Sequence, residues 1–270
     1  MTKFYKCGEE FLAENRDILD AYLLETVFFE CNANCIHEAD ENNFLVKIFD
    51  GDTYLIAVHN SQYPMVIFGD KSLCAEFARQ AYEHKLTFDK VIGALDTCEM
   101  FLAEYGKLVK CTHQVNHSMD IMRCGKTLTS DVDGVEKPSD NDVNEIAELI
   151  VSFTVEALGD SADVDVVKQD VINRLTDFAV IRRNGLIVSV ASVKRKTDKL
   201  ACIADVYTLP QFRNQGLSCK IVTYLTLRIT DDGKLAYLFV DKTNPVSNHL
   251  YTKIGYAYAV PQYEIKLIKN

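Results

Sequence analysis

The fold of this chain is decided by residues 204–225, which read ADVYTLPQFRNQGLSCKIVTYL. The pattern predicts a strand, a break, a short polar turn that contains a glycine, and then an amphipathic helix. Pro210 ends the strand, because proline has no N–H to donate to a neighbouring strand. Gly216 has no side chain, so the backbone there can approach a ligand closely. The first turn of the helix leaves N–H groups unpaired and carries partial positive charge, which suits a phosphate or pyrophosphate.

The polar turn RNQGLS, residues 213–218, resembles the Arg/Gln-x-x-Gly-x-Gly/Ala pyrophosphate loop of the GNAT superfamily of N-acetyltransferases. Ser218 stands where the family has Gly or Ala, and serine is the next smallest residue. A second segment, DKTNPVSNHLYTKIGY at residues 241–256, resembles the late strand and helix of the family, where Asn, Ser and Tyr face the cofactor. Two such segments in this order make the resemblance specific.

The resemblance implies that acetyl-CoA is the cosubstrate and that the second half of the chain holds it. Backbone groups next to the bound thioester are expected to pair with the pantetheine arm and to polarise the thioester oxygen. The cofactor-binding residues implied in this way are Val206, Tyr207 and Thr208 for the pantetheine arm, Arg213, Asn214, Gln215, Gly216, Leu217 and Ser218 for the pyrophosphate, and Asn244 and Ser247 on the late helix. A solvated surface arginine is the alternative for Arg213.

Two residues are candidates for proton transfer. The family's segment implies Tyr251 as the general acid, since a phenol with a reference pKa of about 10 is protonated at neutral pH. A tyrosine that merely packs in the core is the alternative. Asp205 is the candidate base, directly or through water; it is alternatively a ligand of a cationic acceptor or a cap at the strand edge. No metal is expected.

The order of predicted elements gives the domain organisation. Residues 140–268 show two helices, three strands, and then helix, strand, helix and strand, which resembles the mixed α/β fold of the GNAT family. The first half repeats this order without the glycine loop and is expected to be a degenerate GNAT-like domain. The expected domains are residues 1–126, a linker at 127–139, and a catalytic domain at 140–270. One helix is expected over about 9–30, and hairpin turns at 50–52 and 184–185.

Composition narrows the classes of function. The chain has 270 residues, a formal net charge of −10 and no dense run of Lys and Arg, which argues against nucleic-acid binding. The sequence contains no run of about 18 apolar residues, so no membrane span is expected. Nine irregularly spaced cysteines favour reduced thiols in a cytoplasmic protein. A negatively charged protein is compatible with a cationic acceptor. Whether the chain forms a homodimer is left open by the sequence.

The sequence therefore predicts an acetyl-CoA-dependent N-acetyltransferase that acts on the primary amine of a small, and possibly cationic, acceptor. Two alternatives come from other functional classes. One is a non-catalytic acyl-CoA-binding sensor that keeps the loop but has lost acceptor chemistry. The other is an interaction protein that retains only a relic GNAT fold.

Overall fold

The computed structural model describes residues 1–159 and 161–269, so Asp160 and Asn270, the latter the expected end of the catalytic domain, lie outside the description. The chain forms two compact units, residues 1–121 with 259–270, and residues 122–258. The backbone passes from one unit to the other within β6 (Cys111–Cys124) and again within β12 (Ala257–Lys269). The expected boundaries at 126 and 140 did not include this return of the last strand to the first unit.

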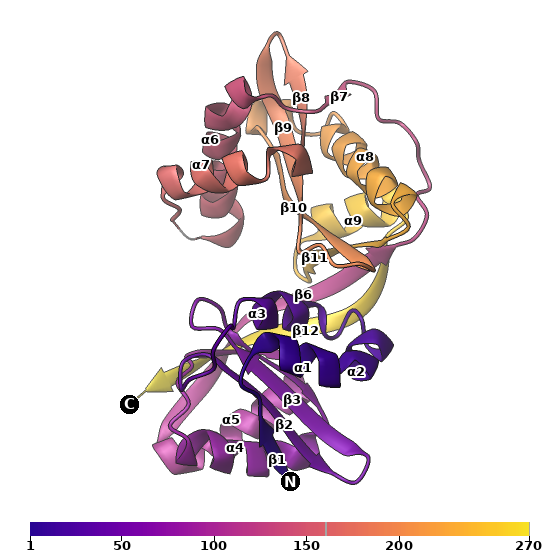
Figure 1. The fold of residues 1–270 in the computed structure, drawn as a ribbon. Coiled ribbons are helices and arrows are strands. Elements are labelled where there is room, and N and C mark those ends of the chain that lie inside the picture. Colours follow the sequence, from indigo (N-terminus) through magenta and orange to yellow (C-terminus); the bar gives the residue numbers. More distant parts are fainter. Residues whose placement is uncertain (160, 270) are drawn as a thin grey trace. The chain divides into compact units, whose positions relative to one another are not determined.

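Unit 1 is a mixed sheet with helices on both faces. Its elements are β1 (Thr2–Phe4), α1 (Gly8–Glu14), α2 (Arg16–Ala21), α3 (Val27–Asn34), β2 (Phe44–Asp50), β3 (Thr53–His59), β4 (Met65–Gly69), η1 (Lys71–Leu73), α4 (Cys74–Glu83), β5 (Lys90–Gly93) and α5 (Leu95–Val109), with most of β6 and β12. The strand order is β1-β2-β3-β4-β5-β12, and only the β4–β5 pair in this series is parallel. One apolar core lies between the sheet and α1 and α3, and another between the sheet and α4 and α5 (Figure 1).

The helix expected over 9–30 is divided into α1, α2 and α3. Buried Asn15 separates the first two helices, and its side-chain amide donates to the carbonyl of Phe11 and to the hydroxyl of Tyr5. A side chain that binds nearby backbone competes with helix continuation, although the apolar spacing runs on through the break. The hairpin turn expected at 50–52 is confirmed, since Asp50 pairs with Thr53 across the β2–β3 turn.

Unit 2 has the same kind of layered structure. Its elements are β7 (Val135–Glu136), η2 (Asp140–Asp142), α6 (Val143–Phe153), η3 (Thr154–Leu158, a π-helix), α7 (Val164–Asn173), η4 (Leu175–Asp177), β8 (Phe178–Arg183), β9 (Leu186–Lys194), β10 (Leu200–Thr208), η5 (Pro210–Phe212), α8 (Leu217–Asp231), β11 (Leu235–Asp241) and α9 (Pro245–Ile254). Helices α6 and α7 cover one face of the sheet, and α8 and α9 cover the other (Figure 1). The element order expected for 140–268 is thus confirmed.

The strand order of unit 2 is β11-β10-β9-β8-β7, with β10 and β11 parallel. It repeats the order β5-β4-β3-β2-β1 of unit 1, so the expected mixed α/β fold is present in both halves. The expected linker at 127–139 contains β7, in which Val135 pairs with Ile181 of β8. A strand of two residues is too short to show the alternation that predicts strands.

Gly8 of α1 packs closely against α3, and substitution of this residue tests the packing of unit 1. A Cβ atom on Gly8 would lie 1.8 Å from the carbonyl oxygen of Ala33 in α3. Gly8→Ala should therefore lower the free energy of unfolding by about 3 kcal/mol, the upper end of overpacking costs, measured by urea denaturation. In the control Gly125→Ala the nearest atom lies 3.8 Å away, so stability should be nearly unchanged. Equal stability of the two variants would contradict this packing of α1 against α3.

Candidate functional site

A β-bulge interrupts β10 within the segment that the sequence singles out. Two residues of β10, Asp205 and Val206, lie opposite Ala191 of β9 alone. Asp205 has a φ of +54°, in the left-handed region. The extra residue breaks the alternation of the strand. Ile203 and Val206 therefore both pack in the core beneath α8, while Tyr207 joins the core beneath α6.

The bulge is held by the side chain of Asp205, which is only 9% exposed. The hydroxyl of Ser192 donates to one carboxylate oxygen at 2.6 Å, and the ammonium of Lys194 lies 2.9 Å from the carboxylate. Both donors come from β9. Two donors do not use the full accepting capacity of a carboxylate, which has about four lone-pair sites. The catalytic role of Asp205 stays a prediction.

Beyond the bulge, β10 loses its neighbour on one side. The parallel pairing of β10 with β11 runs from Leu200 to Ile203, although β10 continues to Thr208 and β11 to Asp241. Within the described residues, the predicted pantetheine-binding residues 206–208 thus have β9 as a strand partner but none on the β11 side. Such a strand edge presents backbone donors and acceptors to an extended amide chain.

The predicted pyrophosphate loop leads from this strand into α8. Asn214 and Gly216 both have left-handed backbones, with φ of +62° and +74°. Gly216 is the N-cap of α8, and no side chain caps the helix there. A Cβ on Gly216 would meet no atom within 4 Å in the described structure, so the space beside it is open. Leu217 is buried in the core, which leaves only its backbone for a ligand.

Ser218 connects the start of α8 to the end of β10. Its hydroxyl lies 2.9 Å from the hydroxyl of Thr208, which in turn lies 2.8 Å from the hydroxyl of Ser189 in β9. The residue that departs from the family's loop pattern is therefore used to fix the helix terminus against the strand.

Arg213 has a partner at each of its three guanidinium nitrogens, although its side chain remains partly exposed. Its Nη1 and Nη2 each lie 2.7 Å from a carboxylate oxygen of Glu156 in η3, and its Nε donates to the carbonyl of Thr208 at 2.9 Å. The guanidinium lies over the ring of Tyr207, 5.5 Å from its centre, and the hydroxyl of Tyr207 donates to Glu156 at 3.3 Å. Hydrogen bonding to Arg213 lowers the pKa of Glu156, which holds its negative charge in place.

Asn244 and Ser247 meet at the start of α9. Asn244 is the N-cap, and its side-chain oxygen accepts the backbone N–H of Ser247 at 3.1 Å. Asn244 is thus the residue that caps α9, and Ser247 supplies the backbone N–H that it binds. Their contacts with a cofactor stay a prediction.

Tyr251 lies in the core between the sheet and α8, where it is 7% exposed and packs edge-on against Tyr256. Its hydroxyl makes no hydrogen bond with any residue in the described part of the chain. Burial raises the pKa of Tyr251, so the phenol keeps its proton over the neutral range. The side chain combines the core packing that the sequence allowed as an alternative with a hydroxyl that is available as a donor.

Four residues at this site were not predicted from the sequence, namely Glu156, Ser189, Ser192 and Lys194. Two of them leave a signal, because LIVSVASVK in β9 is an apolar strand interrupted by two serines. Both serines are completely buried, where a hydroxyl needs a partner. Glu156 leaves none, because its partner lies 57 positions away.

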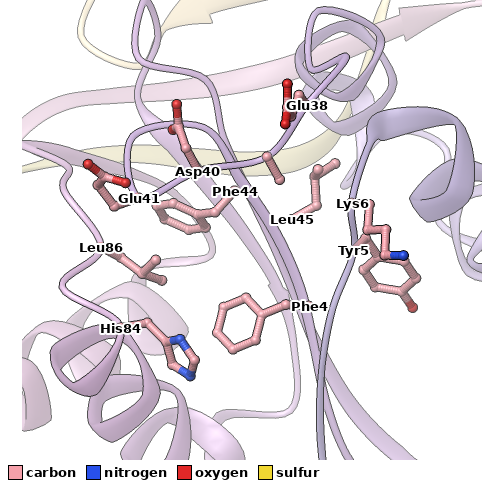
Figure 2. Close-up of a pocket in the computed structure, with 11 residues that line it drawn as sticks. Phe4, Tyr5, Lys6, Glu38, Asp40, Glu41, Phe44, Leu45, His84 and Leu86 are labelled. Atoms are coloured by element: carbon pink, nitrogen blue, oxygen red, sulfur yellow. The ribbon is translucent and has the colours of Figure 1, made fainter.

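A separate pocket of 480 Å³ lies in unit 1 (Figure 2). Phe4, Phe44 and Leu86 line its apolar part, and Glu38 and Glu41 contribute carboxylates. None of the predicted site residues lines it. Among residues 1–159 and 161–269, no group of three or more His, Cys, Asp or Glu is arranged to hold a metal ion. No helix in the same part of the chain has the length and apolar character to cross a membrane.

Comparison with known proteins gives evidence about the fold of the chain. The family model described as "FR47-like protein" matches residues 181–264. No curated protein sequence matches the chain. Solved structures resemble it over its whole length at low identity. A GNAT-family acetyltransferase from Colwellia psychrerythraea is 12% identical, with a TM-score of 0.61 and 100% of both chains covered.

Two further solved structures resemble the chain over its whole length. A GCN5-related N-acetyltransferase from Sphaerobacter thermophilus is 13% identical, with a TM-score of 0.64 and coverage of 100% of this chain and 96% of the other. A tandem GNAT protein from the clavulanic acid biosynthesis pathway is 12% identical, with a TM-score of 0.54 and coverage of 100% and 98%. The resemblance found in the sequence is confirmed at the level of the fold: the chain has the fold of these GNAT structures over its whole length, and residues 181–264 match the FR47-like family model.

Proposed function

We propose that the chain is an N-acetyltransferase that moves an acetyl group from acetyl-CoA directly to the primary amine of a small acceptor. The observation that carries this proposal is the end of the β10–β11 pairing at Ile203, next to an α8 terminus that no side chain caps. The strand edge suits the amides of a pantetheine chain, and the helix terminus suits a diphosphate. The two features lie in the order that the cofactor requires.

The residues of the chain have distinct tasks in this function. The backbone of residues 206–208 would hold the pantetheine arm, and the loop at 213–218 would hold the diphosphate, with Asn244 and Ser247 beside the cofactor. Bound acetyl-CoA supplies an activated acyl group. Tyr251 would donate its proton to the departing sulfur, and its burial keeps that proton available. Asp205, at the bulge, would take up a proton from the acceptor or orient the acceptor.

The acceptor is proposed to be small, and the net charge of −10 favours a cationic one. All nine cysteines are free thiols, which supports the proposed cytoplasmic location. Nucleic acid and membrane have no part in this function, and a homodimer is compatible with it.

The decisive experiment measures the release of free thiol from acetyl-CoA with a panel of polyamines, aminoglycosides and amino acids. Acetylated product, identified by mass, is the expected result. Calorimetric binding of coenzyme A without turnover on any amine would favour the sensor. No binding of coenzyme A would favour an interaction protein with a relic fold.

Substitution of Gly216 tests the proposed pyrophosphate loop. Gly216→Glu should abolish coenzyme A binding in calorimetry, because it places bulk and negative charge in the open space beside the helix terminus. Gly216→Gln carries the same bulk and the same left-handed strain without the charge, and should weaken binding less. Unchanged binding by the glutamate variant would remove the loop from the cofactor site.

Substitution of Tyr251 tests the proposed general acid. Tyr251→Phe should lower kcat by about 100-fold and leave the Kd for coenzyme A nearly unchanged. Tyr256→Phe is the matched control, since it removes another hydroxyl from the same core, one that is bonded to Thr226. Its kcat should stay near that of the unmodified protein. Full turnover by the Tyr251 variant would exclude Tyr251 from the chemistry.

A further inference from the structure

We propose that Glu156 sets the affinity of this protein for coenzyme A, because its carboxylate occupies the guanidinium of Arg213 in the free protein and must yield it to the incoming diphosphate. The inference rests on the proposed function and assigns to that site a residue outside the loop. Glu156 then acts as an internal competitor of the cofactor.

Each of the three guanidinium nitrogens of Arg213 has a partner, and the two that form the end-on fork are both taken by Glu156. Nη1 and Nη2 form a two-pronged pair with the carboxylate of Glu156, both at 2.7 Å, and Nε is taken by the carbonyl of Thr208. A phosphate presents the same paired oxygens to a guanidinium as a carboxylate does. The Nη1 and Nη2 fork of Arg213 can therefore hold Glu156 or a phosphate group, but not both.

The position of the guanidinium places this competition at the proposed diphosphate site. Arg213 is bonded to the carbonyl of Thr208, and the hydroxyl of the same Thr208 contacts Ser218 in the first turn of α8. One residue thus joins the cation and the open helix terminus. An anion that binds the terminus comes within the field of Arg213, and also of the negative Glu156 beside it.

Replacing Glu156 by a phosphate at Arg213 costs little free energy. The side chain of Arg213 is 39% exposed and that of Glu156 is 48% exposed, and an ion pair with this much solvent contributes modestly to stability. Glu156 lies in the π-helical turn η3, which is followed by Gly159 with a left-handed backbone, φ +65°. Among the described residues, its carboxylate is bound by Arg213 and by the longer contact from Tyr207.

Calorimetry on the full chain tests the proposal, with coenzyme A and pantetheine as probes. Glu156→Gln should tighten coenzyme A binding by about two- to fivefold, the range that corresponds to an exposed ion pair. Binding of pantetheine, which has no diphosphate, should not change. Glu148→Gln is the matched control, because it removes the same charge from an exposed position of α6 where no ion pair is formed with a described residue; it should leave both affinities unchanged.

A double-mutant cycle supplies the second measurement. Once Arg213→Gln has removed the guanidinium, adding Glu156→Gln should no longer tighten coenzyme A binding. Equal or weaker binding by the Glu156 variant, equal tightening of pantetheine, or equal tightening by Glu148→Gln would overturn the inference and leave the proposed function standing. Failure of the unmodified protein to bind coenzyme A would instead overturn the proposed function, and the inference with it.

Discussion

The site depends on one backbone constraint, the left-handed Asp205 at the bulge of β10. A non-glycine residue in this conformation costs about 1 kcal/mol, and it persists where the surroundings fix it. Ser192 and Lys194 fix it from β9 through a hydroxyl and an ammonium donor. Because the bulge kinks and twists the strand, β10 stays paired with β9 while it leaves β11 after Ile203. The strand edge proposed for the pantetheine arm exists only as a result.

The two units share a strand order but differ at the connection after the fourth strand of each series. In unit 1, β4 is followed at once by Asp70, whose carboxylate accepts the N–H of Ser72 at 2.8 Å and caps the helical turn. In unit 2, the segment 209–216 separates β10 from α8, and no side chain caps the helix. A helix start that is already satisfied by its own carboxylate has little to offer a diphosphate. This contrast supports the assignment of cofactor binding to the second unit.

Local sequence patterns predicted most of the helices, strands and turns. The helix predicted within residues 241–256 is α9, and the hairpins at Asp50-Gly51 and Asn184-Gly185 are present, because caps and turns are determined within a few residues. The return of β12 to pair with β5 could not be read from such patterns, since a strand's alternation does not identify its neighbour. The same limit applies within the site. The loop and Tyr251 stand out by motif, whereas the partner of Arg213 comes from a distant turn.

Sequence distance also explains why the carboxylate of Asp70 stays bound to its helical turn, whereas the carboxylate of Glu156 can be displaced from Arg213. Asp70 caps a turn only two residues away, so little chain entropy is lost when it binds and a ligand gains little by displacing it. Glu156 reaches Arg213 from a separate helical segment, and both side chains remain open to solvent. Release then needs no repacking of the core, only the exchange of one pair of oxygens for another. The same chemical group is thus a permanent cap in one unit and a replaceable ligand in the other.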